Sequence, residues 1–342
     1  MLGAMTPAAS TDARVASARS GHVAAAGFGV ASVVALVAAV RLSLDVVVFG
    51  LLVFGVAHLG FEVRYITGRY RPMLQGRVLV GVSVALIAIV AGRLVAAGTW
   101  WTQTEIVILA GALVWVLLVH VEDVRRRCAG LAAVATVAVL ALWFTPAWFV
   151  TQAWLHNIIP VVFLWQWSRL IEDRGGRNLF RGITLGWVVL VPVAILAGAF
   201  DPLLRAGTAP AGQIAQAGGI TATVVPPAWQ VDIWSARLLA AFAFLQLLHY
   251  TVWLWHFPRA DRSATQTFEA TVVGHALRSW RLPALLLGVS AVLALVAWFD
   301  YRSGRGMYTS MAAFHAYLEY PVLLALAIGV PSVRRSTRAP AP

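Results

Sequence analysis

Two pairs of ionisable residues stand out in an otherwise apolar sequence, because the spacing within each pair places both side chains on one face of a helix. His58 and Glu62 are four residues apart, and His315 and Glu319 repeat this spacing. Imidazole nitrogens and carboxylate oxygens both bind divalent metals, and a carboxylate also orients a histidine that is bound to one. Each pair therefore indicates metal binding, although a plain His–Glu hydrogen bond between helices would use the same residues.

Further histidines follow a regular arrangement along the chain. The sequence has 8 His, and five of them fall in every second apolar segment: His58, His120, His156, His249 and His315. Three of these, His58, His156 and His249, precede the arginines at the cytoplasmic ends of their segments by similar distances, which places them near one level of a helical bundle. The sequence therefore predicts one cluster in the middle of the membrane.

The predicted metal centre draws on four separate segments. Its ligands would be His58, His156, His249, His315, Glu62 and Glu319. His120 and His256 are weaker candidates, because both lie near the cytoplasmic ends of their segments, where histidine readily meets water. The catalytic residues would be Glu62, Glu319 and Tyr250. An ionisable group in hydrocarbon costs about 2.5–3.5 kcal/mol or more, so a set of this size persists when a cation joins it.

The segments that carry these residues are long enough to cross a lipid bilayer. The chain has 342 residues, of which 60% are hydrophobic and 12% are charged, against about 25% charged residues in a soluble domain. This composition excludes a soluble enzyme and favours an all-α, polytopic membrane bundle, because only helices satisfy the backbone of such spans. The ten predicted spans are 22–40, 46–66, 78–98, 106–121, 129–147, 151–169, 183–200, 232–256, 281–299 and 309–331.

The basic residues predict how these spans are oriented. All 26 are arginines, and they gather in alternate short loops between the spans. This distribution indicates topology and not a nucleic-acid surface, and it predicts that both termini are cytoplasmic. One transmembrane domain would cover 22–331, with an extracytoplasmic loop at 201–230 and cytoplasmic tails at 1–21 and 332–342. The arginine-only basic set is typical of a GC-rich bacterium, so we expect the inner (plasma) membrane of a bacterial cell.

The kinds of ligand available favour one metal. The single cysteine, Cys128, cannot build a thiolate site, and 5 Met spread along the chain do not make a Cu(I) path. A set of His and carboxylate ligands without Cys favours non-heme iron with positions open to dioxygen, while Cu, Zn or haem stay as alternatives. Such a centre would act on a hydrophobic small molecule that enters from the bilayer.

Four segments resemble a known family in their layout. The segments are FGVAHLGFEVRY (54–65), LHNIIPVVFLWQW (155–167), LQLLHYTVWLWHFPR (245–259) and FHAYLEYP (314–321). They resemble the Brp/Blh family of membrane β-carotene 15,15′-dioxygenases, which hold a non-heme iron by intramembrane histidines. The resemblance implies oxidative cleavage of a polyene, with iron bound by His58, His156, His249 and His315. It also implies that Glu62 and Glu319 ligate the iron or orient its imidazoles and that Tyr250 shapes the substrate channel.

Three other classes of protein use the same residue types. A membrane electron-transfer protein needs two facing His for one haem. A transporter of protons, metal ions or a small solute would use intramembrane His and Glu as relay groups. A structural membrane subunit would use them only to pack its helices. The sequence leaves these alternatives open beside the oxidoreductase.

Overall fold

The computed structural model describes residues 11–95, 99–205, 224–226, 229–230 and 232–330. Within these residues all regular structure is helical, which confirms the predicted all-α fold class. The part of the predicted loop 201–230 that is described contains the short helix α11 (Asp201–Arg205), and most of the rest lies outside the described residues, as do 1–10 and the tail 332–342. The first helix, α1, begins at Thr11, inside the segment predicted as the N-terminal tail.

Each of the ten predicted spans overlaps a helix or a helical run, although the fifth span, 129–147, runs four residues past the end of its helix at Trp143. The runs are α1 (Thr11–Arg41), α2–η1–α3 (Ser43–Phe49, Gly50–Phe54, Gly55–Arg69), α4 (Arg77–Val95), α5 (Thr99–His120), α6 (Val124–Trp143), α7–α8 (Thr145–Ile158, Pro160–Ser168), α9–η2–α10 (Arg174–Leu185, Gly186–Leu190, Val191–Leu196), α14–η4–α15 (Asp232–Thr251, Val252–His256, Phe257–Ala260), α18 (Arg281–Phe299) and α19 (Tyr301–Ala327). Two short helices, α16 (Arg262–Glu269) and α17 (Val272–Ala276), connect α15 to α18.

Eight helices of the described chain are long and apolar enough to cross a membrane, judged by length and composition. The predicted spans outside these eight are Ser43–Arg69 and α19, the segments that carry the two His–Glu pairs. The outer helices expose large apolar side chains, among them Val84, Val139 and Leu287. A surface of this kind suits hydrocarbon and not water, so the protein has the build of an integral membrane protein.

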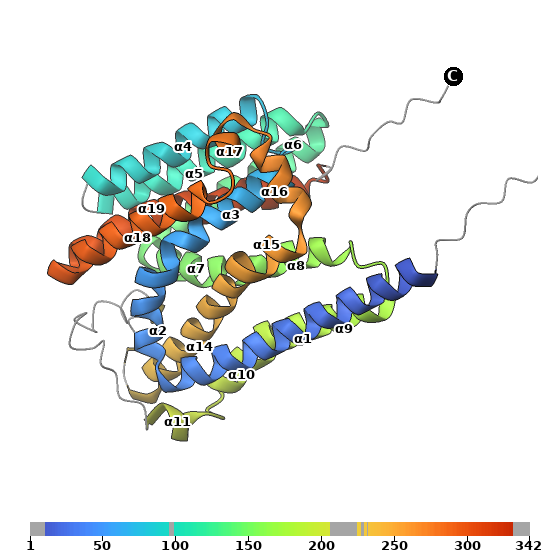
Figure 1. The fold of residues 1–342 in the computed structure, drawn as a ribbon. Helices are drawn as coiled ribbons and strands as arrows, with labels where there is room; N and C mark the ends of the chain where they lie inside the picture. Colours follow the sequence, from blue (N-terminus) through green and yellow to red (C-terminus); the bar gives the residue numbers. More distant parts are fainter. Residues whose placement is uncertain (1–10, 96–98, 206–223, 227–228, 231, 331–342) are drawn as a thin grey trace, which may run out of the picture.

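Helix α14 occupies the centre of the bundle. Figure 1 shows α4, α5 and α6 on one side of the molecule and α1, α9 and α10 on the opposite side, with α14 between them. In the most apolar window of the run that contains α14, 78% of the residues are buried, against 6–33% in the other seven candidate spans. A helix that is apolar all round packs well in such a position. Its C-terminal half therefore carries His249 into the interior.

The helices that carry the histidines are irregular close to them. The π-helical segment η1 ends four residues before His58, and η4 begins three residues after His249. Pro160 follows His156 by four residues, and because proline has no amide hydrogen, the carbonyl of His156 loses its usual helical partner. Single π-helical turns are frequent at functional sites, since they re-aim the side chains that follow them.

Candidate metal centre

Five of the predicted ligands converge on one point inside the bundle. The side chains of His58, Glu62, His156, His249 and His315 each offer a ligand atom, and these atoms all lie within 4.8 Å of one another. They come from four separate runs of the chain: α3, α7, α14 and α19. All but His156, which is half-buried, are buried. We call these five residues the histidine–glutamate cluster, and it could hold a metal ion.

Three imidazoles face one another through the same nitrogen. The Nε2 atom of His315 lies 3.1 Å from Nε2 of His58 and 3.0 Å from Nε2 of His156. Two of the Nδ1 atoms are engaged elsewhere: that of His58 lies 3.3 Å from the carbonyl oxygen of Phe54, and that of His156 lies 2.7 Å from a carboxylate oxygen of Glu319. Both oxygens accept hydrogen bonds, so each of these Nδ1 atoms donates and leaves a lone pair on Nε2.

The three Nε2 atoms together have more lone pairs than protons to share between them. A neutral His315 supplies at most one N–H at its Nε2 atom, so it satisfies only one of its two neighbours. The remaining lone pairs point into the same small space. A cation at that point would accept all three nitrogens at once, as metal ions bound by neutral imidazole do.

The buried carboxylate of Glu62 is a further group that a cation would stabilise. Glu62 is completely buried, and neither of its oxygens has a hydrogen-bond partner among the described residues. Two imidazole nitrogens lie close to its Oε2, Nε2 of His249 at 3.6 Å and Nε2 of His315 at 3.9 Å. Both ring nitrogens of His249 also lack hydrogen-bond partners in the described chain. Buried polar groups are rarely left this way, because the loss of hydration is not offset.

Glu319 lies outside the cluster and is hydrogen-bonded to one of its histidines. Its Oε2 accepts the hydrogen bond from Nδ1 of His156, and the carboxylate is fully buried. A carboxylate in this position fixes the tautomer and the rotation of a metal-binding imidazole. The structure therefore separates the two predicted His–Glu pairs: Glu62 faces the other ligand atoms, and Glu319 faces the outer edge of His156.

Replacing Glu319 with glutamine is expected to weaken metal binding about 10–100-fold, as the loss of an outer-shell partner usually does. The glutamine keeps the size of the side chain but is a weaker acceptor for the His156 N–H. The metal dissociation constant, measured by competition with a chelator, tests this. The exposed Glu122→Gln is the matched control. Equal dissociation constants for Glu319→Gln and the unmodified protein would remove Glu319 from the centre.

Tyr250 lies against the cluster together with two residues that the sequence did not single out. Its ring centroid is 4.5 Å from that of His58, and its hydroxyl accepts a hydrogen bond of 2.7 Å from Nε2 of Gln246. The hydroxyl of Tyr308 interacts with that of Tyr250. A Cβ on Gly55 would lie 2.5 Å from the Tyr308 ring, so glycine is needed for this approach. The spacing of Gln246 and Tyr250, one helical turn apart, is the signal that could have indicated the pair.

A buried ion pair fixes the helix that carries His315 and Glu319. Arg93 donates to both oxygens of Glu105, with 2.7 Å between Nε and Oε2, and to the carbonyl of Thr309 at 2.9 Å. Tyr317, on the same helix as His315, also donates to Glu105. This network connects α4 and α5 to α19. Because each charge in it has a partner of opposite sign, a bound cation is not needed to balance it.

The two weaker candidates lie elsewhere. His120, at the end of α5, donates from Nε2 to the carbonyl of Met73 at 3.0 Å. His256 is buried between the rings of Trp167 and Phe180, with centroid distances of 4.5 Å and 5.5 Å. Neither belongs to the histidine–glutamate cluster.

Fold and site together define the class: a helical protein of membrane type with a buried cluster of His and Glu that could bind a metal ion. Comparison with known protein families, with curated proteins and with solved structures gives no match for this chain.

Proposed function

We propose that the histidine–glutamate cluster binds a non-heme iron ion and that the protein is an integral membrane oxidoreductase. The observation that carries this proposal is the buried Glu62 carboxylate without a hydrogen-bond partner, beside imidazole nitrogens whose lone pairs face one another. A divalent cation would neutralise the carboxylate and occupy the lone pairs. Imidazole and carboxylate ligands without thiolate suit iron and leave room for dioxygen.

The Nε2 atoms are close enough together for one ion to contact several of them. That of His315 lies 3.1 Å from that of His58 and 3.0 Å from that of His156. With His249 and Glu62 the cluster offers five ligand atoms, a set that would hold iron and leave room for dioxygen or another small reactant.

The same spacing argues against haem at this site. A haem held by two histidines has the macrocycle between them, so the two axial nitrogens lie on opposite faces. Here the Nε2 atoms of His58 and His315 are 3.1 Å apart and directly face each other. This separation leaves no room for a porphyrin between the rings.

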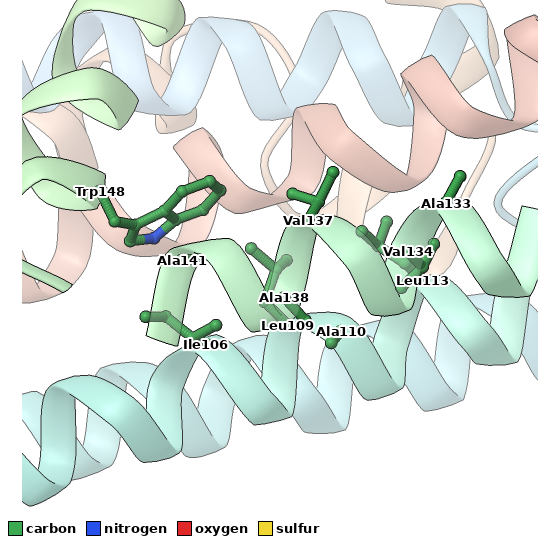
Figure 2. Close-up of a pocket in the computed structure, with 10 residues that line it drawn as sticks. All are labelled: Ile106, Leu109, Ala110, Leu113, Ala133, Val134, Val137, Ala138, Ala141 and Trp148. Atoms are coloured by element: carbon green, nitrogen blue, oxygen red, sulfur yellow. The ribbon is translucent and has the colours of Figure 1, made fainter. Parts of the chain in front are cut away.

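The surface supports a lipid-soluble substrate. An apolar cavity of about 180 Å³ lies between α5 and α6, and Figure 2 shows Trp148 at one end of it. Its lining is apolar, and α6, which forms one of its walls, is the least buried of the candidate spans. Trp148 lies on α7, the helix that also carries His156. A hydrocarbon chain, such as a polyene, suits this lining, and oxidative cleavage of a polyene is the reaction that we propose. From the all-arginine basic set we propose a bacterial plasma membrane, and from the alternation of the arginines we propose that both termini are cytoplasmic.

Elemental analysis and oxygen uptake test this function together. The detergent-purified protein, loaded anaerobically with Fe(II), is expected to retain about one iron per chain, because the cluster has the ligands for one ion. Oxygen uptake should then depend on an added polyene such as β-carotene, with cleaved products detected by chromatography. Retention of zinc or copper in preference to iron would contradict the choice of metal. Iron binding without polyene-dependent oxygen uptake would contradict the reaction.

A further inference from the structure

A column of large side chains leads from the histidine–glutamate cluster toward the end of α3. The ring centroid of His249 is 6.2 Å from that of Trp253, which is 5.7 Å from that of Tyr65. Tyr65 in turn lies 6.3 Å from Tyr70. All of these side chains are buried. We call Trp253, Tyr65 and Tyr70 the aromatic column.

Two buried polar atoms of this column, Nε1 of Trp253 and the hydroxyl of Tyr70, have no hydrogen-bond partner among the described residues. The hydroxyl of Tyr65 interacts with the carboxylate of Asp261. Phenylalanine would pack in place of Tyr70 or Trp253 without leaving a buried polar hydrogen unpaired. Packing alone therefore does not explain Trp and Tyr here. What these two residues offer, and phenylalanine lacks, is ready loss of one electron.

The far end of the column approaches the surface and a proton acceptor. Tyr70 ends α3 and is followed by the exposed Arg71. The phenol of Tyr65 lies beside the carboxylate of Asp261, whose Oδ2 is 3.6 Å from Nη1 of Arg69. An oxidised tyrosine loses its phenolic proton, so a carboxylate beside it gives that proton a place to go.

We propose that the aromatic column removes an oxidising equivalent from the centre when the centre reacts with dioxygen or peroxide and no substrate is bound. The inference rests on the proposed function, because it needs a redox-active metal. Trp253 gives one electron to the centre and regains one from Tyr65, whose phenolic proton passes to Asp261. Tyr65 then takes an electron from Tyr70 and recovers its own proton from Asp261. Asp261 in turn accepts the phenolic proton of Tyr70. A soluble thiol or ascorbate returns one electron to Tyr70, and Asp261 returns the proton.

Electron paramagnetic resonance after rapid mixing tests this route. Iron-loaded protein without substrate is mixed with hydrogen peroxide and frozen. The unmodified protein is expected to give a tyrosyl radical signal, which Tyr65→Phe and Trp253→Phe lose. Both substitutions keep an aromatic ring in the core, and iron content is measured first in every sample. The matched controls Tyr301→Phe and Trp101→Phe also remove an unpartnered polar atom, outside the column, and are expected to keep the signal.

Two results would overturn the proposal while leaving the metal centre intact. One is an unchanged radical signal in Tyr65→Phe with full iron content. The other is the absence of any tyrosyl radical in the iron-loaded, unmodified protein. If no redox-active metal binds at all, the proposed function fails, and the route fails with it. The iron measurement separates these cases.

Discussion

His58→Ala and His249→Ala are each expected to lower metal affinity by at least about 100-fold, the upper end of what the loss of an outer-shell partner costs. Both residues point a ring nitrogen into the shared space, and both are almost completely buried. Alanine leaves no ligand atom and admits no other side chain to replace it. Metal content after purification, together with chelator competition, measures the loss.

The chain supplies a close control for this experiment. His256 is also buried, and it lies seven residues after His249 on the same helical run, but outside the cluster. His256→Ala is therefore expected to retain the metal at full stoichiometry. If His58→Ala and His249→Ala retain as much metal as His256→Ala, the ion is bound elsewhere or not at all.

Glu62→Gln is expected to change stability in a direction that depends on the metal. With metal bound, the variant loses a charged ligand and should unfold at a lower temperature than the unmodified protein. With metal removed, it no longer buries a carboxylate without a partner, and it should be at least as stable as the metal-free, unmodified protein. The difference between the two effects should be about 1–3 kcal/mol, the usual range for an unsatisfied buried group.

Thermal unfolding in detergent, with and without a chelator, measures this difference. The chelator should lower the unfolding temperature of the unmodified protein more than that of Glu62→Gln, because bound metal stabilises the folded state by mass action. Glu122→Gln, exposed and distant from the cluster, should respond like the unmodified protein. An equal response in Glu62→Gln would mean that this carboxylate does not contact the ion.

The sequence predicted the helices well, because a bilayer crossing needs a long apolar run and such runs are visible without any alignment. It also placed His58, His156 and His249 at one level, since depth along a helix follows from counting residues. The rotation of each helix about its axis cannot be obtained by counting residues. Because of this rotation, Glu62 faces the other ligand atoms while Glu319 faces Nδ1 of His156, although both His–Glu pairs have the same spacing.

The helical run that carries His249 and His256 illustrates why rotation could not be predicted. In a regular α-helix, residues seven apart share a face, although the sequence already placed His256 nearer the cytoplasmic end of its span than His249. The π-helical segment η4 spans Val252–His256 and adds residues to one turn, so the phase changes between the two histidines. Tyr308 was missed for a different reason: its contact with Tyr250 joins two helices, and the spacing within one helix cannot show it.

The position of His315 bears on how the protein is assembled in the cell. Its Nε2 atom lies between those of His58 and His156, yet α19 follows the three other ligand-bearing runs along the chain. During synthesis, the earlier helices would enter the bilayer while the coordination sphere still lacks its central imidazole. On the proposed function, full metal affinity would therefore be reached only after translation of α19, because a chain stalled before that helix lacks His315.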